Sequence, residues 1–242
     1  MNKLRLDILP PATAAVIAKL ADEPALAEFC LVGGTAMALQ AGHRRSLDID
    51  LIHFGQQLDK NGLYQAMRRH GAALITPQSM ISTAKINGFD LLAHVQDYVL
   101  DGVKIQCFVE PHGTRYRTGI QVIPGWRFGL ADLPTLFRMK SALITKRSRS
   151  RDYFDLLWFC QQGKTLADII AAAQEADDGP EVASIVEHKL LGLLPLDAED
   201  EGLDPVAVDL GIADIYRHFE TQVQANEIAL ALNIFSKKAT HQ

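Results

Sequence analysis

Short apolar runs alternate with helical patterns along the first half of the chain. Such runs are typical of buried strands, and they lie at residues 29–32, 46–54, 89–95 and 103–109, with a weaker one at 81–86. The last two strong runs flank Asp101-Gly102, a dipeptide typical of a tight hairpin turn. Apolar residues at helical spacing predict helices at residues 11–23, 35–41 and 61–70. The pattern therefore predicts a mixed α/β half.

From about Gly129 onward the pattern is helical. It predicts helices at residues 135–146, 151–161, 165–175 and 181–191, and one or two more between 206 and 235. Two linkers separate these helices, at residues 177–180 and 195–205, and the second is acidic and expected to be mobile. We therefore predict an α/β domain over residues 1–128 and a helical domain over residues 129–242.

Composition narrows the class of protein. The chain has 242 residues, 48% of them hydrophobic, which is enough for one large core or two small ones. No run of eighteen apolar residues and no signal-peptide pattern occur, so we expect no membrane association and a cytoplasmic location. The three cysteines lack metal-binding spacing and are expected to be free thiols. A net charge of -5 argues against a surface devoted to nucleic acid, although the basic run at residues 146–151 allows a local phosphate site.

Two carboxylates lie one residue apart in SLDIDLIHF. In a strand, residues two apart point to one face about 6.5–7 Å apart, so Asp48 and Asp50 share a face while Leu47, Ile49 and Leu51 share the other. Neighbouring carboxylates repel each other unless a cation lies between them. Mg²⁺ binds hard oxygen ligands of this kind, and paired ions can hold a phosphoryl group during displacement. An exposed strand end or a turn would account for the same pattern without a metal.

A glycine pair upstream favours a binding site over an exposed strand end or a turn. Gly33 and Gly34 follow the first strand, and Thr35 is expected to cap the helix that comes next. Backbone N–H groups at a helix start are unsatisfied and attract phosphate, and glycines let the phosphate approach closely. The glycine turn, the Thr35 hydroxyl and the carboxylate strand together indicate a nucleotide-phosphate site.

A second group of charged residues lies in the helical half. Lys140 adjoins the apolar stripe of the helix at 135–146, where it could be a surface lysine or a point-charge clamp on a triphosphate. Asp152 and Asp155 are three apart and hence on one helix face. They could stabilise the helix start, act as a general base, or orient Lys140 or Arg151.

Three ordered motifs carry a resemblance to a known family. GGTAMAL…HRRSLDIDL, DGVKIQCFVEP and MKSALITKRSRSRDYFDLLWF resemble AbiEii-type nucleotidyltransferases of the DNA polymerase β-like superfamily, from about Phe29 to Phe159. The resemblance implies a polymerase β-like mixed sheet followed by a helical half that completes the active site. It also implies transfer of a nucleoside monophosphate from an NTP to an acceptor hydroxyl with Mg²⁺, or Mn²⁺ in its place. Many members are toxins of type IV toxin–antitoxin or abortive-infection systems.

The resemblance also implies roles and partners. The phosphate-binding turn would be Gly33, Gly34 and Thr35, where many relatives have Gly-Ser, and Mg²⁺ would bind Asp48 and Asp50. The acceptor would be RNA such as tRNA, a protein side chain or a small molecule. A cognate antitoxin would be the partner protein.

The remaining motif positions are basic, polar or acidic residues expected to bind the nucleotide or support catalysis: Arg45, Ser46, Lys140, Arg151, Asp152 and Asp155. The match to the family's Arg-x-Ser-x-Asp run is loose, so either Arg44 or Arg45 could fill the basic slot. Lys140 would contact the triphosphate. Asp152 or Asp155, in the Arg-Asp-x-x-Asp ending, would support catalysis.

One position departs from the superfamily pattern. A third carboxylate is common on a later strand beside the first two, and here the corresponding residue is Gln106. Glu110 lies about 13 Å further along an extended chain, too far to replace it. Two interpretations follow: an enzyme that works with Asp48, Asp50 and an aspartate of the helical half, or a non-catalytic nucleotide-binding module. A third, an interaction domain with merely solubilising aspartates, leaves the glycine turn unexplained.

Overall fold

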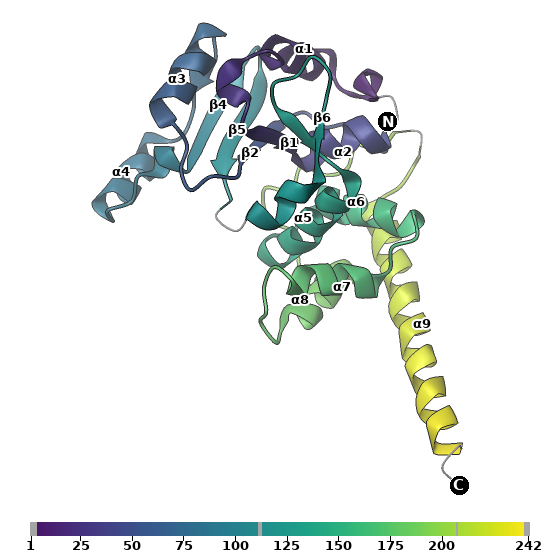
Figure 1. Ribbon diagram of the computed structural model, residues 1–242. Helices are drawn as coiled ribbons and strands as arrows, with labels where there is room; N and C mark the ends of the chain where they lie inside the picture. The colour runs from purple at the N-terminus through teal and green to yellow at the C-terminus, as the bar shows by residue number, and fades with distance from the viewer. Residues whose placement is uncertain (1–3, 111–112, 207, 240–242) are drawn as a thin grey trace. The chain divides into compact units, whose positions relative to one another are not determined.

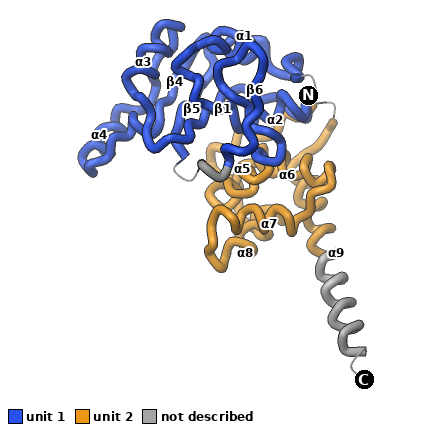
Figure 2. Tube along the Cα trace, in the orientation of Figure 1, with its two compact units in different colours: residues 1–136 blue, residues 137–242 orange. Residues whose placement is uncertain are grey.

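The chain forms two compact units. The computed structural model describes residues 4–110, 113–206 and 208–239, and its units are Met1–Leu136 and Phe137–Gln242 (Figure 2). The first unit contains the sheet and the second is helical, so the predicted α/β class is confirmed. The sheet continues past the position where the sequence pattern becomes helical, because its strand β7 begins at Gly129.

One mixed sheet organises the first unit. Its strands among the described residues are β1 (Phe29–Val32), β2 (Ile49–His53), β3 (Ala73–Leu74), β4 (Val95–Leu100), β5 (Val103–Val109), β6 (Ile120–Val122) and β7 (Gly129–Ala131). They are arranged in the order β3-β4-β5-β2-β1-β7-β6 (Figure 1). The β2–β5 and β1–β7 pairs are parallel, and the other pairs are antiparallel. Every residue of β1 is buried, so the core of this unit is centred on that strand.

Helices of the first unit connect these strands. They are α1 (Pro11–Leu20), α2 (Gly33–Ala41), α3 (Lys60–Arg69) and α4 (Gln78–Ile86). Short 3-10 helices lie at Leu6–Ile8, Pro24–Leu26, Leu91–Ala93 and Gly113–Gly119. Helix α2 ends at Ala41, and its C-cap residue Gly42 adopts φ +66°, as the predicted glycine stop requires. Helix α2 begins directly after β1, so the glycine pair forms the first two residues of that helix.

The second unit is built from helices close to the predicted ones. They are α5 (Leu133–Lys146), α6 (Ser150–Gln161), α7 (Leu166–Gln174), α8 (Val182–Leu190) and α9 (Ile212–Ala239). Thr165 and Asp168 form a capping box at the start of α7, which explains why the pattern located that start correctly. Where one or two helices were expected between 206 and 235, the described residues of that region form the helix α9, whose residues Ile215 and Phe219 are fully buried.

Several predicted strands are wrong in position or type. Residues 81–86 belong to helix α4, in which no residue is buried, so their apolar character does not report a core strand. The run at 89–95 contains a 3-10 helix, and the strand begins only at Val95. Strand β2 begins at Ile49, so Asp48 precedes it, and Leu47 is 50% exposed instead of lying in the core.

The cysteines and the apolar character of the helices can be compared with what the composition predicts. All three cysteines are free thiols, as predicted. Burial raises the pKa of the Cys30 thiol to about 12, which makes it an inert apolar group at neutral pH. Nowhere in the described part of the chain does a helix have the length and apolar character that crossing a membrane requires.

Candidate functional site

The first two residues of α2 lie directly against charged and polar residues at the start of β2 and in the segment before it. Gly33 has φ +70°, and a Cβ there would collide with the Asp50 carboxylate, at 3.0 Å from its Cγ. A Cβ on Gly34 would lie 2.5 Å from the Arg44 guanidinium and 2.8 Å from the Ser46 hydroxyl. The glycines therefore allow a helix start, a carboxylate and a guanidinium to meet in one small space.

Thr35 has a structural task that the sequence did not indicate. Helix α2 begins at Gly33 with Val32 at the N-cap position, so the prediction that Thr35 caps it is wrong. The Thr35 side chain is fully buried, and its hydroxyl donates to the backbone carbonyl of Asp48. Thr13 likewise donates to the carbonyl of Leu47, at 3.0 Å. The two hydroxyls fix the backbone on which Asp48 is carried, and a contact between Thr35 and phosphate stays a prediction.

The two adjacent arginines differ in environment. Arg44 is 2% exposed and lies beside Gly34, where its Nη1 donates to the carbonyl of Arg45 at 3.0 Å. Arg45 itself is exposed. Arg44 is therefore the arginine of the pair that lies beside the glycine turn, and nucleotide binding by Arg45 stays a prediction. Ser46, which is 8% exposed, lies beside Gly34 as well.

Asp48 and Asp50 are both half-buried, and Ile49 between them is 1% exposed. This alternation turns the carboxylates away from the core, although Asp48 lies just outside the strand. Two carboxylates of this kind suit a hard cation such as Mg²⁺. Among the described residues, no group of three His, Cys, Asp or Glu side chains is placed to hold a metal. An ion at this position would therefore take its other ligands from water, phosphate or neutral oxygen atoms.

Gln106 lies next to Asp50, and the sheet adds a further acid that the sequence reading missed. Asp50 pairs with Gln106 on β5, and Gln106 pairs with Asp97 on β4. The Gln106 Nε2 donates to Asp97 Oδ1 at 2.7 Å. The sequence of the hairpin could have indicated Asp97, because the tight Asp101-Gly102 turn sets the register that pairs position 97 with position 106.

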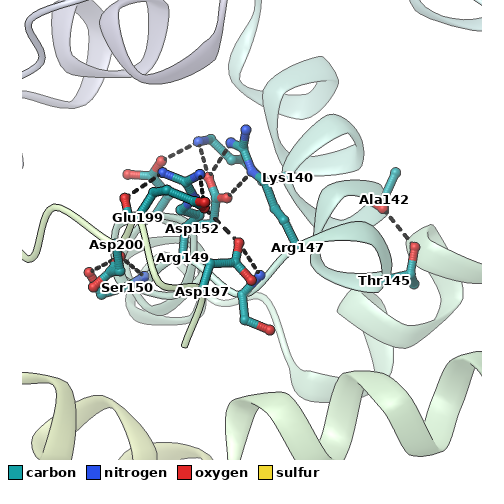
Figure 3. A network of polar contacts seen from close by, with 12 residues as sticks. Lys140, Ala142, Thr145, Arg147, Arg149, Ser150, Asp152, Asp197, Glu199 and Asp200 are labelled. Atoms are coloured by element: carbon teal, nitrogen blue, oxygen red, sulfur yellow. Dashed lines mark hydrogen bonds and ion pairs between the residues drawn. The ribbon is translucent and has the colours of Figure 1, made fainter. Parts of the chain in front are cut away.

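The second unit contains a buried ionic cluster on α5 and α6 (Figure 3). Lys140 is 3% exposed, and its Nζ lies 2.6 Å from Asp152 and 2.8 Å from Asp155. Both carboxylates are buried, and Arg147 also reaches Asp152, with Nε at 2.7 Å. The interpretation of Lys140 as a surface lysine is therefore wrong. The two aspartates share a helix face, as predicted, and that face holds the Lys140 ammonium.

The environment of Asp152 bears on its chemistry. Burial alone raises the pKa of the Asp152 carboxyl, but the charges and hydrogen bonds of Lys140 and Arg147 outweigh burial and hold that pKa below its usual value. Asp152 is therefore ionised at neutral pH and a weak proton acceptor, whereas a general base works best with a pKa near the operating pH. Of the roles left open by the sequence, the orientation of Lys140 suits Asp152 better than proton transfer.

The acidic segment at 197–202 is part of the linker at 195–205 that was predicted to be mobile, but it is bonded to the start of α6 (Figure 3). Asp200 accepts hydrogen bonds from the backbone N–H and the hydroxyl of Ser150, both at 2.9 Å. Arg149 lies 3.3 Å from Asp197, and Arg151 lies 2.6 Å from Glu201. These arginines are therefore engaged within the unit, and orientation of Arg151 by Asp152 or Asp155 stays a prediction. Its contact with a nucleotide stays a prediction.

Replacing Asp200 with alanine is expected to lower the free energy of unfolding by about 1 kcal/mol, because the backbone N–H at the start of α6 loses its acceptor. Urea denaturation followed by circular dichroism would measure the change. Glu199→Ala is the matched control, since that side chain is 79% exposed, and it should change stability by less than about 0.5 kcal/mol. Equal effects of the two changes would contradict this role of Asp200.

The fold and the site define a class of protein. A mixed sheet brings a glycine-started helix against a carboxylate and a buried arginine. The model of the family "Nucleotidyl transferase AbiEii toxin, Type IV TA system" matches residues 15–225. The chain therefore belongs to the AbiEii family of nucleotidyltransferase toxins. The match confirms the resemblance seen in the motifs and extends it well beyond Phe159, into α9.

Two solved structures from Helicobacter pylori are among those to which the chain is similar. The chain is 16% identical to JHP933, with a TM-score of 0.44 and 94% of each chain covered. It is 18% identical to a protein described as a candidate nucleotidyltransferase, with a TM-score of 0.47 and coverage of 87% of this chain and 89% of that one. No curated protein matches the chain.

Proposed function

We propose that this protein transfers a nucleoside monophosphate from an NTP to an acceptor hydroxyl, with release of pyrophosphate, as the toxin of a toxin–antitoxin pair. The observation that supports this most directly is the contact of the start of α2 with Asp50 in β2 and with Arg44 before it. Gly33 adjoins the Asp50 carboxylate and Gly34 adjoins Arg44. The backbone proposed to bind phosphate thus lies beside an acidic side chain, which supports joint action on one triphosphate.

Each group in the first unit has a task in this proposal. Asp48 and Asp50 would hold Mg²⁺, or Mn²⁺ in its place, through hard carboxylate oxygens. When bound, the ion would supply charge stabilisation to the phosphoryl group in transfer. The N–H groups at the start of α2 would bind phosphate oxygens, and the Arg44 guanidinium would add a fixed positive charge beside them. Catalysis would then rest mainly on positioning and electrostatics.

Lys140 of the second unit is proposed to contact the triphosphate. Its ammonium is held by Asp152 and Asp155, so these aspartates would act as positioning residues for it. A lysine held by two carboxylates loses little further side-chain entropy when it binds an anion, because its conformation is already restricted.

The acceptor is proposed to be a hydroxyl on RNA such as tRNA, on a protein, or on a small molecule, and a cognate antitoxin is the proposed protein partner in the cytoplasm. The basic run at 146–151 had favoured a polyanionic acceptor. The ion pairs of Arg149 and Arg151 with the acidic segment weaken that reason, so the acceptor class rests on the assay below.

A catalytically inactive nucleotide-binding module is the second candidate. It is favoured by Gln106, a neutral residue, in the row beside Asp50 where the superfamily commonly has an acid. Such a module would bind NTP without turnover.

A labelling assay separates the two candidates. The purified protein would be incubated with each α-³²P NTP in turn, Mg²⁺, total cell RNA and lysate. Label in one RNA or protein band, dependent on one nucleotide and on Mg²⁺, supports transfer and identifies donor and acceptor class together. NTP binding without label would overturn the proposed transfer and favour the inactive module.

Gly33→Ala is expected to lower kcat/KM for transfer by about 100-fold or more. Alanine at φ +70° costs about 1–2 kcal/mol, and its Cβ would also displace the Asp50 carboxylate. Gly42→Ala, at the other end of α2, is the matched control: it has φ +66° but approaches only the flexible side chain of Arg5, at 3.0 Å. Thermal denaturation should show a similar loss of stability in both variants, with transfer retained only in Gly42→Ala. Equal transfer by the two would contradict the role of the Gly33–Asp50 contact.

A further inference from the structure

Three polar residues form a row across adjacent strands of the sheet. Asp50 on β2, Gln106 on β5 and Asp97 on β4 are paired in register, and adjacent strands are about 4.8 Å apart. All three are half-buried, whereas Ile105 and Cys107, which flank Gln106 along β5, are fully buried. The row therefore lies on the face of the sheet turned away from these core residues, with Gln106 between the two aspartates.

The hydrogen bond between Gln106 and Asp97 fixes which way the amide is turned. An ionised carboxylate only accepts hydrogen bonds, so Gln106 must present its NH₂ group to Asp97, and Nε2 does so at 2.7 Å. Asp97 and Asp50 are on opposite sides of β5. With Nε2 committed toward β4, the carbonyl oxygen of the amide is turned away from Asp97 and remains available as an acceptor.

The position of Asp97 is itself fixed by the chain that follows β3. Its backbone N–H donates to the hydroxyl of Thr76 at 2.9 Å, and its carbonyl accepts from the backbone N–H of Ile75 at 2.8 Å. Thr76 is 8% exposed, so this anchor is sheltered from water. Asp97 is thus a fixed acceptor.

We propose that Asp97 is a positioning residue that holds the Gln106 carbonyl oxygen toward Asp50 as a neutral ligand for the divalent cation. This rests on the proposed function. Carbonyl oxygens suit Mg²⁺ and Mn²⁺ as carboxylates do, and partners that orient a ligand typically change metal affinity by about 10- to 100-fold. A carboxylate at position 106 would face Asp97 directly and be repelled by it. Asp97 therefore gives a physical reason for glutamine at this position.

Mn²⁺ binding to the purified full chain, measured by electron paramagnetic resonance of the free ion, tests this without any turnover. Asp97→Asn removes the charge but keeps the size, and its amide can pair with either end of Gln106. We expect about 10-fold weaker Mn²⁺ binding. Asp101→Asn is the matched control, because it removes one carboxylate from the turn of the same hairpin, where Asp101 is exposed, and it should leave Mn²⁺ binding unchanged.

A double variant distinguishes positioning from a general structural role. Gln106→Glu alone is expected to bind Mn²⁺ no better than the wild-type protein, because the new carboxylate is repelled by Asp97. Asp97→Asn combined with Gln106→Glu exchanges donor and acceptor, so the new amide can hold the new carboxylate, and binding should return to wild-type strength or exceed it. A merely structural defect at position 97 would not be rescued in this way.

The outcomes separate the inference from the proposed function. Wild-type binding that is lost in Asp48→Asn but unchanged in Asp97→Asn would keep the metal site and overturn the role of Asp97. Absence of rescue in the double variant, with its thermal midpoint near the wild-type value, would also overturn that role. No Mn²⁺ binding by the wild-type protein would instead overturn the metal-dependent function on which the inference rests.

Discussion

Asp48→Asn is expected to lower nucleotidyl transfer by about 1,000-fold or more while leaving the fold intact. Loss of one charged ligand removes several kcal/mol of transition-state stabilisation, and each 1.36 kcal/mol is about tenfold in rate. The fold should survive because the Thr35 hydroxyl contacts the backbone carbonyl of Asp48, which the change retains. Initial rates of label transfer at saturating NTP would measure the loss.

Asp22→Asn is the control for this prediction. Asp22 is in the same unit, and its side chain is 87% exposed, so the change removes one carboxylate from the unit without touching the site. It should transfer at the wild-type rate. Transfer by Asp48→Asn at a rate near that of Asp22→Asn would remove Asp48 from the mechanism, whatever the family relationship.

The sheet shows how far local pattern predicts structure. The strands at Phe29–Val32 and Val103–Val109 were predicted at their exact bounds, because continuous or alternating apolar residues suffice to define a strand buried on at least one face. Strands β6 and β7 were not predicted, since three residues are too few to show a period.

Asp97 was missed although the information for finding it was in the sequence. The apolar run at 89–95 predicts a strand that pairs with β5, whereas a tight turn requires the partner strand to end directly before Asp101. Turn geometry, and not hydrophobicity, would have placed Asp97 opposite Gln106.

The sequence alone could not distinguish Arg44 from Arg45. Only the path of the loop between α2 and β2 determines which guanidinium is turned inward.

The ionic cluster of the second unit was predicted only in part, because helical spacing can be read from the sequence and the packing of one helix against another cannot. Helical spacing puts Asp152 and Asp155 on one face, but it cannot say that α5 brings Lys140 to that face. The packing of α5 against α6 decides this, and it changes Lys140 from a surface cation into one enclosed by acids.

Lys140→Met is therefore expected to lower the free energy of unfolding by about 3–5 kcal/mol. Methionine has a similar volume, so packing is largely kept, but Asp155, which is fully buried, loses the ammonium at 2.8 Å. Removing one partner of a buried ion pair leaves the other charge uncompensated, and that is what makes the change costly. Urea denaturation at pH 7 would measure the loss. Lys146→Met, at the exposed end of the same helix, should change stability by less than about 0.5 kcal/mol.

The pH dependence of this loss gives a sharper test than its size. In the wild-type protein the pKa of Asp152 is lowered, so the stability it contributes is present above the unfolded value of about 3.9 and is lost as pH falls through the lower folded value. Without the ammonium of Lys140, less positive charge offsets the rise in carboxyl pKa that burial causes. The buried carboxyls therefore become easier to protonate in the folded state. The difference in stability between Lys140→Met and wild type should therefore shrink as pH falls from 7 toward 4. A difference that stays constant over this range would mean that lost packing, and not an uncompensated buried charge, causes the destabilisation.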